Sequence, residues 1–174
     1  RPKRGDNSEE YHTKYHEYML ECFKRYPYMW AHYYWNMFDF AADARNQGGE
    51  PGMNHKGLVT FDRKTKKDVF FLYKAYWNKK DKFVYLAGRR YEKRSLANQT
   101  ITVYSNLDEV SLYQNGKLVG TKKGENVFKF DITLEAENKL EVKAGDYTDS
   151  CVIYKVDEEP AEYRLAKGDS SNWM

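Results

Sequence analysis

The sequence predicts an α/β segment followed by an all-β, Ig-like sandwich. Three patterns support this prediction: an almost unbroken apolar and aromatic run at residues 28–40, a basic amphipathic stretch at about residues 66–77, and short strand-like segments from Asp81 onward. The apolar run is too short for a membrane helix and lacks the alternation of a half-exposed strand. We therefore interpret it as a strand that is buried on both faces, as in a parallel sheet.

A helix is predicted ahead of this run. Asn7 or Ser8 can cap its N-terminus, and Glu10 follows Asn7 at the spacing of a capping box. Aromatic and apolar residues then recur at spacings of three and four, which places them on one helical face: Tyr11, Tyr15, Tyr18, Met19, Cys22 and Tyr26. Pro27 ends the predicted helix.

A long loop is predicted between the buried strand and the second helix. Residues 41–56 contain Gly48, Gly49, Pro51 and Gly52, and loops of this length inside compact domains are often functional. A short apolar segment at residues 57–61 precedes the helix. Strand, loop and helix together form one βα unit of an α/β enzyme, a fold type that places its site in such loops.

The second half of the chain predicts seven short strands separated by turn residues. Asn115-Gly116, between SLYQ and KLVG, is a strong signal for a two-residue hairpin, because both positions must adopt positive φ. The residues expected to face the interior of the sandwich are Val103, Leu112, Phe128, Phe130, Leu140, Val142 and Val152.

Composition excludes some classes of function. A chain of 174 residues forms one domain or two small ones, and its net charge of +3 gives no basic excess of the kind that indicates a nucleic-acid partner. The sequence contains no membrane-spanning stretch and no signal peptide, so no membrane partner is predicted and the cellular compartment stays open. The high aromatic content, 17%, suits dense packing and sugar stacking equally well.

The cysteine and histidine residues predict no metal or cofactor site. Cys22 and Cys151 lie in different predicted domains, each among apolar neighbours, and we expect both to be buried free thiols. No CxxC spacing is present. His12 and His16 are four residues apart on the first helix, which alone does not define a site.

Three motifs carry a resemblance to a known family. WNMFDF, NHKGLVTFDR and KKDVFFLYKAYW, within residues 35–77, resemble the last βα unit of the barrel in glycoside hydrolase family 2, of the β-galactosidase type. From about Lys82 the chain resembles the Ig-like sandwich that follows this barrel. The resemblance implies a C-terminal part of a TIM-barrel catalytic domain at residues 1–78, the sandwich at residues 79–157, and a tail or linker at residues 158–174.

By this resemblance the chain is a C-terminal fragment of a retaining hydrolase that acts on β-galactosides. Such enzymes use two carboxyl groups, which the family pattern places upstream of Arg1, so we predict no catalytic residue in this chain. Glu9 and Glu10 in SEEY echo the family's nucleophile motif, but they follow a predicted cap and open a helix, so we interpret the motif as a helix start.

Two alternatives remain open. The parent enzyme could have β-glucuronidase specificity. The chain could instead be a non-catalytic module that binds carbohydrate or supports the barrel, with sugar contacts on aromatic residues of the sandwich such as Tyr85, Tyr91 or Tyr113.

Four residues are predicted to bind substrate. Trp35, near the C-terminal end of the buried strand, provides a flat surface for a sugar ring, with a core role as its alternative. Asp39 could bind a sugar hydroxyl or hold a loop group such as Arg45, because a buried carboxylate needs a partner. Asn54 and Lys56 match a pair that grips the sugar carboxylate in glucuronidases of the family, and their alternative role is to order the loop.

The predicted partner is a carbohydrate, a β-galactoside in the intact enzyme. Self-association is a second predicted interaction, because a barrel strand without its companions exposes backbone groups and aromatic faces. Trp30, Tyr34 and Phe38 are the residues expected at that contact, and the first 78 residues are otherwise expected to be partly disordered.

Overall fold

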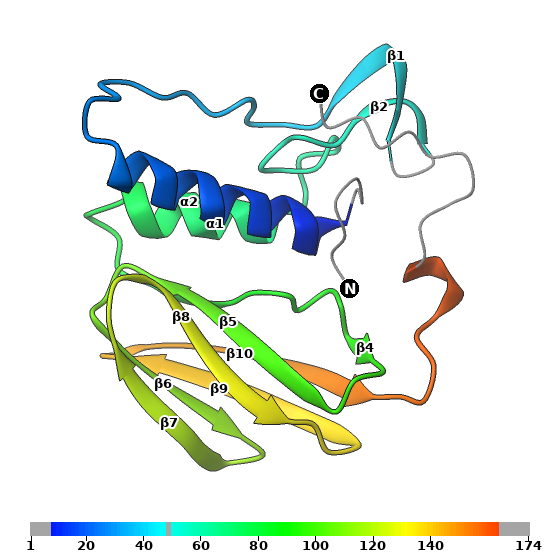
Figure 1. The fold of residues 1–174 in the computed structure, drawn as a ribbon. Helices are drawn as coiled ribbons and strands as arrows, with labels where there is room; N and C mark the ends of the chain where they lie inside the picture. The colour runs from blue at the N-terminus through cyan, green and yellow to red at the C-terminus, as the bar shows by residue number, and fades with distance from the viewer. Residues whose placement is uncertain (1–7, 48–49, 164–174) are drawn as a thin grey trace. The chain divides into compact units, whose positions relative to one another are not determined.

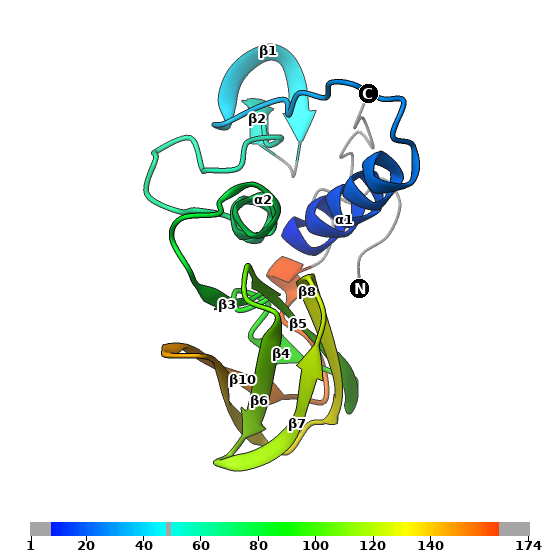
Figure 2. The same ribbon diagram turned by 90° about the vertical axis from the view of Figure 1, so that its left-hand side faces the viewer.

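The computed structural model describes residues 8–47 and 50–163. The chain divides into two compact units, and the boundary between them lies within a helix, after Phe70. The first unit holds the first helix and a β-hairpin, and the second, Phe71–Tyr163, holds a β-sandwich (Figures 1 and 2). Among the helices of the described ranges, none is long and apolar enough to cross a membrane.

The first helix forms as the sequence predicts. Helix α1 spans Glu9–Arg25, and the side chain of its N-cap, Ser8, accepts a hydrogen bond from the Tyr11 N–H at 3.2 Å. Glu9 and Glu10 occupy the first turn, where negative charge favours a helix N-terminus. The interpretation of the SEEY motif as the start of a capped helix is therefore confirmed, with Ser8 as the cap, while Asn7, the other predicted cap, lies outside the described residues.

The predicted strand at residues 28–40 is not formed over most of its length. Only its end pairs within the described residues: Phe38 forms a parallel bridge with Val59, and the Asp39 N–H donates to the Val59 carbonyl at 2.9 Å. Trp30 and Tyr33 are 92% and 90% exposed, so the predicted burial on both faces is wrong for this chain. The physical reason is that the described residues provide no neighbouring strand to pair with and cover residues 29–35.

The exposed aromatic residues bear on the predicted self-association. Trp30 and Tyr33 present apolar rings to solvent, as that hypothesis requires, whereas the Tyr34 hydroxyl is engaged within the unit. Association between copies of the chain stays a prediction.

The segment predicted as a loop is a β-hairpin. Strand β1, Phe40–Gln47, pairs antiparallel with strand β2, Glu50–Asn54, and the register shifts between Ala41 and Asn46. Gly and Pro residues favour turns, which explains the loop prediction, but Pro51 is tolerated here because a two-stranded hairpin consists only of edge strands. The hairpin leads directly into the segment from Asn54 to Gly57.

Helix α2 begins close to the predicted position and ends where it was predicted. It spans Asp68–Trp77. The Asp68 N–H donates to the Glu9 carboxylate at 2.6 Å, so a residue of α1 satisfies one of the free donors at the start of α2.

The second unit is a β-sandwich. One sheet has the order β4-β10-β9-β6-β7 and the other has the order β3-β5-β8 (Figure 1). The strands are β3 Val84–Leu86, β4 Lys93–Arg94, β5 Asn98–Ser105, β6 Glu109–Gln114, β7 Lys117–Lys123, β8 Asn126–Thr133, β9 Glu137–Ala144 and β10 Tyr147–Lys155. A short 3-10 turn, Ala161–Tyr163, follows. Asn115 and Gly116 adopt φ values of 50° and 79°, as the predicted hairpin between β6 and β7 requires.

The core of the sandwich lies between its two sheets. Six of the seven predicted core residues are buried there: Val103, Leu112, Phe128, Phe130, Leu140 and Val142. The seventh, Val152, is wrong, because it is exposed while Ile153 is buried and Cys151 packs against the core. The stretch Cys-Val-Ile is apolar throughout, so its composition gives no alternation from which the inward face can be read. Both cysteines of the chain are free thiols, as predicted, but both are only partly buried.

This register gives a testable difference between adjacent residues. Ile153→Val removes one methylene group from a fully buried site and should cost about 1 kcal/mol of unfolding free energy. Val152→Ala removes two methyl groups from an exposed site and should cost less than about 0.5 kcal/mol. Amide exchange of β9 and β10 in the two variants measures the difference. Equal costs, or a larger cost for Val152→Ala, would contradict the assigned faces.

Candidate functional site

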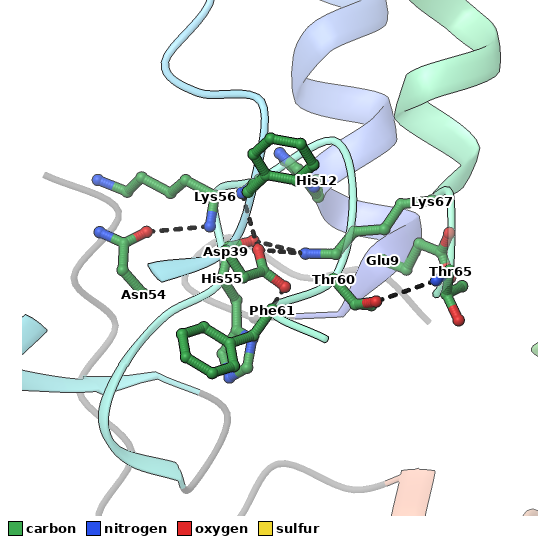
Figure 3. A network of polar contacts seen from close by, with 12 residues as sticks. Glu9, His12, Asp39, Asn54, His55, Lys56, Thr60, Phe61, Thr65 and Lys67 are labelled. Atoms are coloured by element: carbon green, nitrogen blue, oxygen red, sulfur yellow. Dashed lines mark hydrogen bonds and ion pairs between the residues drawn. The ribbon is translucent and has the colours of Figure 1, made fainter. Parts of the chain in front are cut away.

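Asp39 is the centre of a polar network in the first unit (Figure 3). Asp39 comes directly after Phe38, which forms the parallel bridge with Val59, and it is only 2% exposed. Carboxylate oxygen Oδ1 accepts hydrogen bonds from the Gly57 N–H at 2.8 Å and from Lys67 Nζ at 2.7 Å. The buried carboxylate is therefore paired with a cation and with the main chain of the loop.

His55 completes this network. Its Nδ1 lies 3.6 Å from Oδ2 of Asp39, and its Nε2 lies 3.0 Å from the Glu50 carboxylate. Burial by itself would raise the pKa of Asp39, but interactions with His55, Lys67 and the Gly57 amide outweigh it, and the pKa lies below its ordinary value. The contacts of Asp39 match the loop-holding role that the sequence offered as an alternative, with Lys67 rather than Arg45 as the partner.

Asn54 and Lys56 lie beside this network and face away from it. Asn54 is buried, and its Oδ1 accepts from the Lys56 N–H at 3.0 Å. Because this oxygen is engaged, the amide can present its NH₂ group as a donor. In Figure 3 the amide nitrogen of Asn54 and the ammonium of Lys56 extend to the same side, whereas His55 contacts Asp39.

The charge around Lys56 favours an anion. Burial, and secondly the positive charge of Arg45, lower the pKa of Lys56. Both effects disfavour the ammonium form, and a bound carboxylate would relieve them. The arrangement of amide donor and ammonium is therefore suited chemically to an anionic ligand.

Trp35 is exposed. The residue is 69% exposed, and its indole packs edge-to-face on Phe40, with ring centroids 6.2 Å apart. The peptide bond between Trp35 and Asn36 is cis. A core role for this residue does not fit its exposure in this chain, and its role as a sugar platform stays a prediction.

A tight turn closes the segment between the loop and α2. The Asp62 carboxylate accepts from the Thr60 hydroxyl at 2.6 Å and from the Lys64 N–H at 3.1 Å. The Arg63 guanidinium donates to the carbonyls of Phe61 and Asp39 and lies 4.0 Å from the centroid of the Phe38 ring. Asp62 and Arg63 thus stabilise the turn.

Three residues near the candidate site were not predicted from the sequence. Lys67 donates to Asp39, and His12 and Tyr34 connect α1 to the carbonyl of Lys56. Lys67 stands in a run with Lys64 and Lys66, and nothing in that run marks it as the paired one. His12 and Tyr34 are 22 positions apart, so only the tertiary fold brings them together. Within the described ranges, no cluster of His, Cys, Asp and Glu is arranged to hold a metal ion.

Of the three tyrosines considered as sugar contacts on the sandwich, Tyr85 offers no open ring, whereas Tyr91 and Tyr113 are partly buried. Tyr85 is buried and stacks on Phe71, with ring centroids 3.7 Å apart. The Tyr91 hydroxyl donates to the Glu159 carboxylate, and Lys143 lies 5.0 Å from the centroid of the Tyr113 ring.

Comparison with known proteins gives consistent matches. Residues 97–145 match a family described as a domain of unknown function, DUF4982. The chain is 42% identical over 117 residues to a β-glucuronidase of Bacteroides fragilis, which covers 67% of this chain and 17% of that protein. It is also 50% identical to an FMN-binding β-glucuronidase from Facaelibacterium prausnitzii L2-6 of known structure, with a TM-score of 0.90. That match covers 95% of this chain and 26% of that one.

A further solved structure gives the same result. A Bacteroides fragilis protein provisionally described as a β-galactosidase is 38% identical, with a TM-score of 0.78, and the match covers 89% of this chain and 24% of that one. The chain thus spans 17–26% of the length of each of these relatives, and its sequence identity to them confirms the resemblance of its motifs to glycoside hydrolases. Its homologues are β-glucuronidase- and β-galactosidase-like glycoside hydrolases of the family 2 type, and the chain corresponds to one portion of them.

Proposed function

We propose that this chain is part of a retaining β-glucuronide hydrolase, in which Asn54 and Lys56 bind the carboxylate of the sugar. The observation that carries the proposal is the Asn54–Lys56 pair, an amide donor and an ammonium directed to the same side beside Arg45. An uncharged galactoside offers no group that needs this positive charge. The relatives named as β-glucuronidases support the same substrate class.

In this function the residues of the chain bind and orient substrate. Lys56 pairs with the carboxylate, Asn54 donates a hydrogen bond to it, and Trp35 offers its exposed indole to the apolar face of a sugar ring. The proposed arrangement places residues 1–78 at the end of a TIM barrel and the β-sandwich after it. The two carboxyl groups of a retaining mechanism would belong to other parts of the enzyme.

A β-galactoside is the second candidate substrate. The sequence motifs first indicated this class, and one solved relative is provisionally described as a β-galactosidase. In that case Asn54 and Lys56 would order the loop, and the hydroxyl groups of the sugar would be bound elsewhere.

Replacing Lys56 separates the two candidates. In the full-length enzyme, Lys56→Gln should lower kcat/KM for 4-nitrophenyl β-glucuronide roughly 10- to 100-fold, because a hydrogen bond between charged groups is lost. The kcat/KM for 4-nitrophenyl β-galactoside should change less than about threefold, since that substrate has no carboxylate. Lys64→Gln, at an exposed position of the same unit, is the matched control and should leave both substrates unaffected.

Two outcomes would count against the glucuronide proposal. One is an unchanged kcat/KM for the glucuronide in Lys56→Gln. The other is an equal loss for both substrates, which would indicate that Lys56 orders the loop and does not recognise charge.

A further inference from the structure

A chain of hydrogen bonds leads from helix α1 to the main chain of Lys56. His12 Nε2 lies 2.9 Å from the Tyr34 hydroxyl oxygen, and this hydroxyl donates to the Lys56 carbonyl at 2.6 Å. A tyrosine hydroxyl has one proton, and here that proton forms the hydrogen bond to the carbonyl. His12 Nε2 must therefore be protonated and donate a hydrogen bond to the Tyr34 oxygen, so the direction of each hydrogen bond is fixed.

His12 is held firmly in this role. It is 2% exposed, and the ring of His16 packs edge-to-face against it at a centroid distance of 5.0 Å. His16 also packs on the Tyr34 ring at 4.8 Å, so one aromatic side chain contacts both members of the chain. Burial lowers the pKa of His12 well below its ordinary value, which keeps the ring neutral near pH 7.

The main chain around Lys56 is held at three consecutive polar groups. Its own N–H donates to Asn54 Oδ1, its carbonyl accepts from Tyr34, and the following N–H, of Gly57, donates to Asp39. Gly57 also packs so tightly that a Cβ would lie 2.1 Å from the Asp39 nitrogen. The backbone from which the Lys56 side chain extends therefore has little freedom to shift.

We propose that Tyr34, oriented by His12, is a positioning residue that fixes the Lys56 ammonium for recognition of a substrate carboxylate. This proposal rests on the proposed function and deepens it. Neither residue needs to touch the substrate, because their effect passes through the carbonyl of Lys56. The lysine side chain is long and flexible, so ordering it on a bound carboxylate costs conformational entropy. A main chain that is already fixed reduces this cost, and recognition of the carboxylate by Lys56 is favoured.

The full-length enzyme with Tyr34→Phe tests the proposal. The ratio of kcat/KM for 4-nitrophenyl β-glucuronide to kcat/KM for 4-nitrophenyl β-galactoside should fall about three- to tenfold, mostly through KM for the glucuronide. Tyr33→Phe is the matched control, because that neighbouring ring is 90% exposed, and it should leave the ratio unchanged. His12→Leu should lower the ratio like Tyr34→Phe, whereas His12→Gln, which keeps a donor, should retain more of it.

A second measurement reports on the hydrogen bond itself. In the 174-residue chain, Tyr34→Phe should speed amide exchange at residues 56–58, and Tyr33→Phe should not. An unchanged selectivity ratio in Tyr34→Phe, with the ratio reduced in Lys56→Gln, would overturn the positioning role and leave the proposed function standing. An unchanged ratio in Lys56→Gln would overturn the proposed function, and the positioning role with it. Equal losses for both substrates in Tyr34→Phe would also overturn the proposal, because they would indicate a general structural role.

Discussion

Replacing Lys67 by methionine is expected to lower the free energy of unfolding of the first unit by about 3 kcal/mol, the lower end of the range for breaking a buried ion pair. The Asp39 side chain is 3% exposed and that of Lys67 is 12% exposed. Methionine keeps most of the side-chain volume but removes the ammonium, so the buried Asp39 carboxylate loses its ion pair with Lys67. Lys67 also donates to the His55 carbonyl at 3.0 Å, and this contact is lost as well.

Lys64→Met is the matched control for this substitution. Lys64 is exposed, and the hydrogen bond that it gives to Asp62 comes from its main chain, so the expected cost is within about 0.5 kcal/mol. Amide exchange of α1 and of residues 56–59 at pH 7 measures both variants. A cost below about 1 kcal/mol for Lys67→Met would mean that the pair contributes no more than an exposed salt bridge.

A double variant isolates the cause. Asp39→Asn combined with Lys67→Met removes both charges, so it should be less destabilised than Lys67→Met alone. If the double variant instead shows the sum of the two single losses, the cost arises from packing and not from an unpaired charge.

The parts of the fold that the sequence predicted well are those specified by local signals. Ser8 and the acidic residues after it mark the start of α1, and Asn115-Gly116 marks a hairpin by its backbone requirement. In β8 from Phe128 onward and in β9 from Lys139 onward, apolar and polar residues alternate, and the buried residues follow that alternation. At Val152 the alternation is masked by apolar neighbours, and the prediction there is wrong.

The prediction for residues 28–40 was wrong for a non-local reason. An apolar run indicates that burial would be favourable, but burial requires a partner surface, which composition cannot provide. In the described part of the chain, pairing begins only near Phe38, and Trp30 stays exposed. The β1–β2 hairpin was missed for a related reason. Its Pro and Gly residues favour turns and predicted a loop, but main-chain pairing between the two strands stabilises the hairpin.

The candidate site was predicted in part. Asn54 and Lys56 were found from a short motif, and the structure places them side by side with nitrogen atoms extended in a common direction. The residues that hold them, Tyr34 and Lys67, belong to distant segments of the sequence, and their types are common in this chain. Selecting them requires the distances that only the folded chain supplies.

The first unit is also expected to lose stability as the pH falls from about 6.5 to about 4, because of His12 and His16. Burial lowers the pKa of His16 to about 4, and burial followed by the positive charges of His16, Lys67 and Lys56 lowers that of His12. In the unfolded chain both side chains titrate near 6.5. Between these values the unfolded state binds more protons than the folded state, so the unfolding free energy decreases as the pH falls.

The expected loss is about 1.4 kcal/mol per pH unit for each histidine, or roughly 3 kcal/mol for His16 across the whole interval. Asp39 acts in a different range. Its pKa is lowered in the folded state, so its stabilisation is lost only below the ordinary carboxyl pKa of about 3.9.

Urea unfolding of the 174-residue chain between pH 8 and pH 4, monitored by amide exchange of α1, measures the dependence of the unfolding free energy on pH. His16→Phe keeps a ring against His12 and Tyr34 and should reduce the slope by about half, because one of two titrating groups is removed. A flat profile between pH 6.5 and pH 4.5, or an unchanged slope in His16→Phe, would mean that protons reach these rings without unfolding the unit.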